Sequence, residues 1–237
     1  MVPGLTRRTL LTAGLEIPVT LRRNRQARRM ILRVQPAESG SDDGVVVTLP
    51  HHIAESEALE WLATKQDWIV QRLSKLSPRI AFIDGATVPF LGQPHVIHHQ
   101  QGRGTVKRLD GEIHVFGGPE HLSRRLLDWM RKQARQHIQQ LVEIKSSQLG
   151  LPAGRLSVRD TRSRWGSCAA NGNLSFCWRL IMAPEFVLDY VVAHEVAHLK
   201  EHNHSERFWL EVSRLTEHRQ QAKSWLNKNG EALRRYG

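Results

Sequence analysis

Residues 186–204 read FVLDYVVAHEVAHLKEHNH, and this stretch carries most of the information about the fold and the chemistry. The segment from Phe186 to Leu199 is apolar almost all round, which predicts a helix buried in a core, and Pro184 suits its first turn. Within it, the pattern H-E-x-x-H places His194 and His198 about 40° apart on one helix face and roughly 6 Å apart along the axis. Two imidazole rings in that arrangement can bind one metal ion.

Glu195 lies between the two histidines but is offset from their stripe. Its carboxylate is therefore expected to reach a water molecule activated by the metal rather than the metal itself, which is the role of a general base. The alternative, that these residues only pack an ordinary helix, would bury three polar groups without partners. The pattern thus favours a hydrolytic metal site with Glu195 as its catalytic residue.

A catalytic zinc ion takes three protein ligands and one open position, and His202 and His204 are the candidates for the third ligand. On a straight helix, His202 would lie about 12 Å from His194, too far for both to bind one ion. His204 can return to the ion only if the helix ends first, and Asn203 is expected to end it in a left-handed conformation. The sequence therefore predicts one zinc ion per chain, bound by His194, His198 and His204.

The composition indicates a globular protein, because 40% of the 237 residues are hydrophobic and 24% are charged. The net charge is +11, and residues 1–36, with eight arginines and one glutamate, contribute +7 of it. Such an excess attracts phosphate-rich or acidic partners. The alternative is a solvated sheet face whose arginines discourage edge pairing. The candidate contacts to nucleic acid are Arg22, Arg23, Arg25, Arg28 and Arg29.

Membrane insertion and export are not expected. No run approaches the roughly 18 apolar residues that a membrane span needs. Arg7 and Arg8 superficially resemble a twin-arginine export signal, but the apolar part ends by Glu16, too early for such a signal. Two cysteines, Cys168 and Cys177, are too few for a disulfide framework. They flank one turn, across which they can face each other, and they are expected to be reduced and to contribute to packing. A cytoplasmic protein is therefore expected.

The order of the periodic patterns predicts an α+β fold that begins with an Arg-rich, β-rich region over residues 1–118. Alternating apolar residues and glycine-rich turns, including a turn segment at 38–44, predict strands there. One amphipathic helix is expected from Ser56 to Leu76, ended by Ser77-Pro78.

Residues 119–237 are predicted to form a mostly helical, zincin-like domain. A long helix is expected over residues 120–149, ending at Gly150. A short hairpin should turn at Asn171-Gly172-Asn173 before the helix that carries the histidines. The prediction is also compatible with the β-rich region and this domain packing together as one unit.

Three runs around the histidine motif carry a resemblance to a known family. They are Thr161-Arg162-Ser163-Arg164-Trp165-Gly166-Ser167-Cys168, the segment from Gly172 to Pro184, and Leu188 to Leu199 followed by Asn203-His204-Ser205-Glu206-Arg207-Phe208-Trp209. In these runs the chain resembles the YgjP-like zinc metallopeptidases, relatives of the SprT type. Upstream, the order and spacing of an Arg-rich strand, the Asp67-Trp68-Ile69 helix and two glycine turns are also similar.

This resemblance implies a metallopeptidase in which the same three histidines bind zinc and Glu195 is the catalytic acid. The chain departs from the family after Leu215, where members often have a proline and an aromatic residue. Here the sequence is Thr216-Glu217-His218. The sequence therefore does not predict how this segment shapes the far wall of the substrate cleft.

The aromatic residues near the motif are expected mainly to pack. Trp165 and Trp178 are assigned to the core. Phe208 and Trp209, which follow an N-cap at Ser205, should pack the next helix onto the metal-binding helix. The hairpin from Arg164 to Trp178 is the candidate for pairing with an extended substrate. The candidate oxyanion-stabilising residues are Tyr190, His202 and His218.

Three functions are compatible with the motif. The leading one is a zinc-dependent peptidase for peptide or protein substrates, in which Glu195 acts as general base and then delivers the proton to the leaving amine. The second keeps the metal but hydrolyses nucleotides or other phosphate-containing substrates, as the basic charge suggests. The third is a nucleic-acid-binding module with a structural zinc ion, against which the open ligand position and Glu195 both count.

Overall fold

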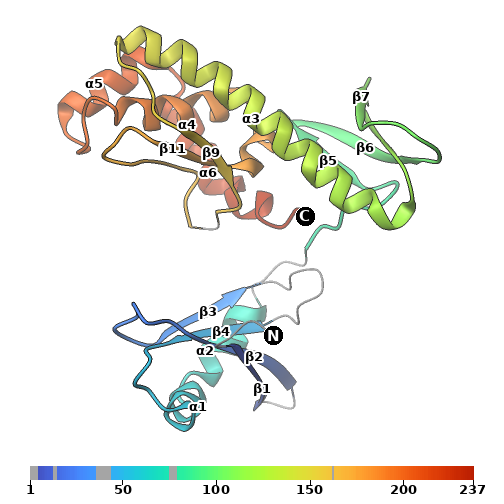
Figure 1. The fold of residues 1–237 in the computed structure, drawn as a ribbon, viewed down its shortest axis with the longest axis vertical. Coiled ribbons are helices and arrows are strands. Elements are labelled where there is room, and N and C mark those ends of the chain that lie inside the picture. The colour runs from blue at the N-terminus through green and yellow to red at the C-terminus, as the bar shows by residue number, and fades with distance from the viewer. Residues whose placement is uncertain (1–4, 13–14, 36–43, 75–78, 162) are drawn as a thin grey trace. The chain divides into compact units, whose positions relative to one another are not determined.

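The computed structural model describes residues 5–12, 15–35, 44–74, 79–161 and 163–237. The chain divides into two compact units, unit 1 (Met1–Arg79) and unit 2 (Ile80–Gly237). The predicted α+β class is confirmed, with helices and mixed sheets in both units (Figure 1). The division falls at residue 79 rather than at the predicted residue 118, so the strands after residue 80 belong to the same unit as the histidine motif.

Unit 1 is a four-stranded sheet with two helices packed on its apolar face. In the order β1-β2-β4-β3, β2 and β4 are parallel and the outer pairs are antiparallel. Alternate residues Ile17, Val19 and Leu21 are buried, as the period of two predicts for a half-covered strand. The elements are β1 (Leu5–Thr12), β2 (Leu15–Arg23), β3 (Ile31–Gln35), β4 (Gly44–Leu49), α1 (Glu55–Ala63) and α2 (Gln66–Ser74).

The single helix predicted from Ser56 to Leu76 is thus two helices. α1 ends at Ala63, and the hydroxyl of its C-cap residue, Thr64, donates a hydrogen bond of 2.7 Å to the carbonyl of Trp61. Such bonds from threonine compete with the continuing helix. The predicted stop at Ser77-Pro78 lies outside the described residues, as does the greater part of the turn segment predicted at 38–44.

Unit 2 begins with a second four-stranded sheet and a long helix. The sheet order is β5-β6-β8-β7, with β6 and β8 parallel. Its strands are β5 (Thr87–Phe90), β6 (Gln93–Gln100), β7 (Lys107–Leu109) and β8 (Glu112–Phe116). A 3-10 turn, η1 (Pro119–His121), leads into α3 (Leu122–Leu149), which is capped by Gly150 at φ 67°, as predicted. In Figure 1, α3 runs along unit 2 from the β5–β6 side to α4.

The second half of unit 2 holds the histidine motif. A small sheet of order β10-β11-β9 is followed by η2 and three helices. The β10–β11 register pairs Cys168 with Leu174 rather than with Cys177, so the two free cysteines do not face each other across the turn. The elements are β9 (Leu156–Arg159), β10 (Gly166–Cys168), β11 (Leu174–Cys177), η2 (Trp178–Met182), α4 (Glu185–Ala197), α5 (Glu206–Leu215) and α6 (Arg219–Leu233).

The tight turn between β5 and β6 packs against η2 and the start of α4. Leu91 and Gly92 both have positive φ, 48° and 79°, and their N–H groups donate to the carbonyls of Ile181 (2.7 Å) and Met182 (3.3 Å). A Cβ on Gly92 would lie 2.9 Å from Cα of Pro184, so only glycine allows this approach. The contact explains why the strands after residue 80 share one core with α4.

A buried ion pair ties α3 to α4. Lys145 Nζ lies 2.6 Å from Asp189 Oδ1 and also donates to the carbonyl of Leu215 at 2.7 Å. The hydroxyl of Thr216 donates to the other carboxylate oxygen of Asp189 at 2.5 Å. The segment after Leu215, which the sequence left open, therefore anchors the end of α5 to α4. Within the described residues, no helix is long and apolar enough to cross a membrane.

We expect Asp189→Asn to lower the free energy of unfolding by about 3 kcal/mol, because it leaves the Lys145 ammonium buried without its counterion. Asp128→Asn is the matched control, because it breaks an exposed pair with Arg124 on α3 (3.6 Å) and should change stability by less than about 0.5 kcal/mol. Urea unfolding of both variants measures the difference. Equal effects would show that the Lys145 pair does not stabilise unit 2.

Candidate metal centre

The histidines of the motif come together because α4 ends early. The last helical residue is Ala197, and His198 is the C-cap. The chain then turns and brings His204 back before α5 begins at Glu206. The prediction that the helix ends before His204 is confirmed, but the predicted stop at Asn203 is wrong, because Asn203 does not adopt a positive φ. The helix ends instead through the turn that begins at His198.

Three imidazole rings form a compact cluster. One ring nitrogen each from His194, His198 and His204 lies within 4.8 Å of the other two. Nε2 of His204 is 3.1 Å from Nε2 of His194. Two nitrogens bound to one tetrahedral zinc ion at about 2.0–2.1 Å would be about 3.3 Å apart. The spacing of these nitrogens therefore fits a shared metal ion.

The surroundings of His194 and His198 favour the neutral form of these two rings. Burial, followed by the neighbouring histidines and Arg219, lowers the pKa of His194 to about 4. Burial also lowers the pKa of His198. Nδ1 of His198 lies 2.9 Å from the carbonyl of Glu201, an arrangement in which Nδ1–H donates and Nε2 is left with its lone pair. Neutral imidazoles are required because the protonated ring has no lone pair for a metal.

Aromatic residues at the start of α5 hold the rings in place. The side chain of Ser205 accepts a hydrogen bond from the N–H of Phe208 at 3.4 Å, so the predicted N-cap is confirmed. Phe208 is fully buried, and its ring centre lies 4.4–5.0 Å from the centres of the three imidazoles. Trp209 stacks against His204 at 5.6 Å. His202 is exposed and does not belong to the cluster.

A second contact fixes the returning loop from its other side. Lys200 Nζ lies 2.6 Å from a carboxylate oxygen of Glu211 on α5. This hydrogen bond lowers the pKa of Glu211 and so keeps it ionised at neutral pH. The loop between His198 and His204 is thus tied to the helix that follows it.

Glu195 is buried beside the cluster and packs against β10. Its side chain is 7% exposed, and burial raises its pKa to about 7, against the lowering effects of Arg164 and of a backbone hydrogen bond from Cys168. A Cβ on Gly166 would lie 2.6 Å from Cγ of Glu195, so only glycine fits here. A carboxyl group with a pKa near neutrality is suited to take up and release a proton.

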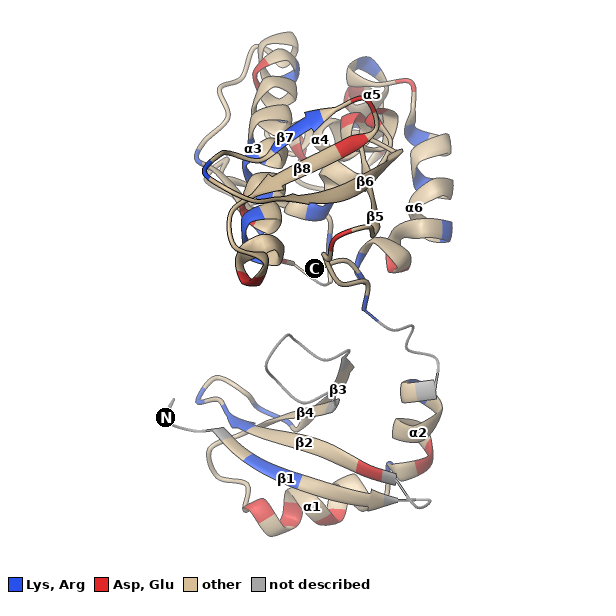
Figure 2. Cartoon of the chain, turned by 90° about the vertical axis from the view of Figure 1, so that its right-hand side faces the viewer, with Lys and Arg blue, Asp and Glu red and all other residues tan. Residues whose placement is uncertain are grey.

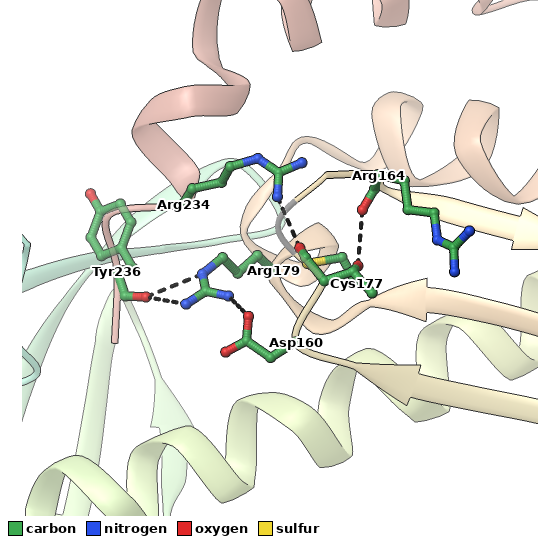
Figure 3. A network of polar contacts seen from close by, with 7 residues as sticks. Asp160, Arg164, Cys177, Arg179, Arg234 and Tyr236 are labelled. Carbon is green, nitrogen blue, oxygen red and sulfur yellow. Dashed lines mark hydrogen bonds and ion pairs between the residues drawn. The ribbon is translucent and has the colours of Figure 1, made fainter. Parts of the chain in front are cut away.

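The C-terminal end of the chain holds the loop that leads into β10 (Figure 3). The buried guanidinium of Arg179 pairs with Asp160 and donates to the carbonyl of Tyr236 at 3.0 and 3.2 Å. Arg234 donates to the carbonyl of Thr161 at 2.9 Å and lies over the ring of Trp165. Through these contacts the residues that follow α6 hold the segment before the strand that packs on Glu195.

The remaining sequence candidates lie at different distances from the cluster. The ring of Tyr190 is 6.0 Å from that of His194, whereas His218 packs on Phe186, one helical turn further away. His218 also lines a groove of about 980 Å³ along the N-terminal half of α4, which does not include the three histidines. Trp178 is fully buried, as predicted, and Trp165 is half-buried against the same core.

The sequence analysis missed one charged residue at the site. The guanidinium carbon of Arg219, at the start of α6, lies 3.5 Å from the ring centre of Trp209. Its positive charge adds to the effect of burial that lowers the pKa of His194, and it opposes the effect of burial that raises the pKa of Tyr190. Within the described part of the chain, Arg219 makes no ion pair with a carboxylate. No local spacing links Arg219 to the histidine motif, so sequence reasoning had no signal for it.

Comparisons with known proteins place the chain in a family. The sequence matches the YgjP-like metallopeptidase domain over residues 28–229. No curated protein matches the chain. A crystal structure of the metallopeptidase zymogen of Pyrococcus abyssi abylysin matches with 21% sequence identity and a TM-score of 0.35, covering 38% of this chain and 93% of that chain.

We expect His204→Ala to weaken metal binding by at least about 100-fold, because it removes one of three ligands. His202→Ala is the matched control: it removes an exposed histidine of the same loop and should change affinity by less than about twofold. Metal content after dialysis against buffered divalent ions measures both. Similar losses in the two variants would contradict the assignment of His204.

Proposed function

Because the chain belongs to the YgjP-like metallopeptidase family, we propose that it is a zinc-dependent peptidase that hydrolyses peptide bonds. The observation that carries the proposal is the cluster of His194, His198 and His204 beside the buried carboxyl group of Glu195. A set of three imidazoles suits zinc, and it leaves one coordination position open for chemistry. A structural zinc ion would have four protein ligands, and the described residues offer no fourth histidine, cysteine or carboxylate in this cluster.

The roles of the residues follow from their positions. A bound zinc ion would polarise the scissile carbonyl group and lower the pKa of a water molecule. Glu195 takes the proton from the attacking water as its oxygen bonds to the carbonyl carbon. It then gives the proton to the amine nitrogen as the C–N bond breaks. Glu195 extends from α4 toward β10, where the absence of a side chain at Gly166 leaves room for its carboxyl group.

The edge of the small sheet supports binding of an extended peptide. β10 is the outer strand of the order β10-β11-β9, and its first residue, Gly166, contacts Glu195. A peptide that pairs with β10 gains backbone hydrogen bonds whatever its side chains. This arrangement would bring a peptide bond to the metal centre with little sequence selectivity.

Arg219 is assigned to stabilise negative charge during the reaction. Its guanidinium is held over Trp209 next to the cluster and has no carboxylate partner in the described residues. A fixed cation at the place where the carbonyl oxygen becomes negative lowers the barrier. Tyr190 is the second group close enough to assist, because its ring centre lies 6.0 Å from that of His194, whereas His218 packs on Phe186 further along α4.

We expect Glu195→Gln to lower kcat for peptide hydrolysis by at least about 10³-fold, because proton uptake and delivery are lost together. Zinc content should not change, since Glu195 is not a ligand. Glu206→Gln, an exposed change of the same charge at the start of α5, is the matched control. The measurement is cleavage of a mixed peptide library by zinc-loaded protein.

The same pair of variants separates the competing functions when nucleoside triphosphates are tested in parallel. Hydrolysis of nucleotides but not peptides, abolished by Glu195→Gln, would replace the peptidase by a phosphate hydrolase. Zinc binding without hydrolysis of either substrate class would leave a structural role for the metal.

Arg219→Gln should lower kcat by about 10²-fold with a small change in KM, because its charge acts mainly on the transition state. Arg219→Lys keeps the charge and should recover part of the rate. Lys223→Gln, one turn further along α6 and exposed, controls for the loss of net charge. Steady-state kinetics on one peptide substrate give kcat and KM for each variant. A rise in KM alone would assign Arg219 to substrate binding instead.

A further inference from the structure

Unit 1 contains an open groove of about 640 Å³ that the metal site does not use. β3 and the residues just before it form one side, and the two helices with their connection form the other. Three of the lining residues are cationic, two are tryptophans and none is acidic. They are Arg29, Met30, Ile31, Leu32, Arg33, Trp61, Lys65 and Trp68.

The two tryptophans differ in how much of the ring is available. Trp61 is half-buried and packs against the core of unit 1. Trp68 is 47% exposed, although indole is among the side chains that gain most from burial. A large aromatic ring left open in a groove is a platform on which another flat ring can stack.

The cations of the groove have no acidic partner among the described residues. None of Arg29, Arg33 and Lys65 forms an ion pair with the described residues, whereas Arg8 on β1 pairs with Glu55 at 2.7 Å. Figure 2 shows acidic residues on α1, on α2 and at one end of β2, while arginines occupy β1, β2 and the loop after β2. The groove therefore presents unpaired positive charge next to aromatic surface.

We propose that this groove binds single-stranded nucleic acid, with bases stacked on Trp68 and Trp61 and phosphates contacted by Arg29, Arg33 and Lys65. Flat bases and a phosphate on every nucleotide match this alternation of indole and cation. An acidic peptide would satisfy the cations but would leave the exposed Trp68 ring without a stacking partner. Duplex DNA hides its bases from such a platform.

The arginine run from Arg22 to Arg29, which the sequence predicts to contact nucleic acid, contributes only in part to this groove. Arg29 lines the groove, but Arg23 donates to the carbonyls of His51 and Ile53 at 3.1 and 2.9 Å and so fixes the loop before α1. Arg33 and Lys65 lie outside the run and take part instead. Because the groove lies within unit 1, its binding does not depend on the proposed peptidase activity.

The test compares two double variants of the full chain that lose the same charge. Arg33→Gln/Lys65→Gln removes two groove cations, and Arg7→Gln/Lys223→Gln removes two exposed cations, on β1 and α6, neither of which lines the groove. Binding to a labelled oligothymidylate of about 20 nucleotides is followed by anisotropy at several salt concentrations. We expect the groove variant to bind at least about tenfold more weakly, with a log–log salt slope smaller by about 1.4. The control should change affinity by less than about threefold.

Stacking is tested separately with Trp68→Ala and Trp68→Phe, whose folding is checked by circular dichroism. The first should lose about tenfold in affinity and the second should recover most of it, because phenylalanine keeps a ring face. Equal effects of the two double variants, or no effect of Trp68→Ala, would overturn the proposal. Equal binding of duplex DNA or of polyglutamate would also overturn it, in favour of a general polyanion surface.

Discussion

Unit 2 depends on one constraint: a helix that is apolar almost all round must bury a carboxyl group and lead directly into a cluster of three histidines. α4 packs against α3, α5, α6 and β10, and its residues belong to a single core. Polar groups in such a place must find partners. Asp189 is paired with Lys145 and Thr216, while the imidazoles of His194 and His198 turn toward His204.

The same constraint explains why the site needs parts of the chain that carry no chemistry. The cluster closes only because α4 stops at Ala197 and the chain returns at His204, where Phe208 and the Lys200–Glu211 contact fix the loop. The carboxyl group of Glu195 fits against β10 because Gly166 has no side chain there. The loop before that glycine is in turn held by Arg234 and the C-terminal residues (Figure 3). Rigid support of this kind is what a catalytic group needs to act without reorganisation.

Unit 1 follows different rules. Its sheet is covered by two short helices, and its core is separate from that of unit 2. The charge that dominates the N-terminal sequence is used in three ways: Arg23 bonds to backbone, Arg8 pairs with Glu55, and Arg29 lies in the groove with the tryptophans. A run of arginines in the sequence therefore indicates a basic region but does not tell which cations remain free for a partner.

The sequence by itself determined the class of the fold, the long helix ending at Gly150, the buried helix with His194 and His198, and the need for the chain to turn before His204. These features depend on local periodicity, on glycine at a left-handed position and on the reach of a helix, all of which act over a few residues. It did not determine that α4 ends at Ala197 rather than near Asn203, that Cys168 faces Leu174, or that Arg219 from α6 lies beside the cluster. Only the tertiary structure decided these, because each depends on packing between segments that are far apart in the chain.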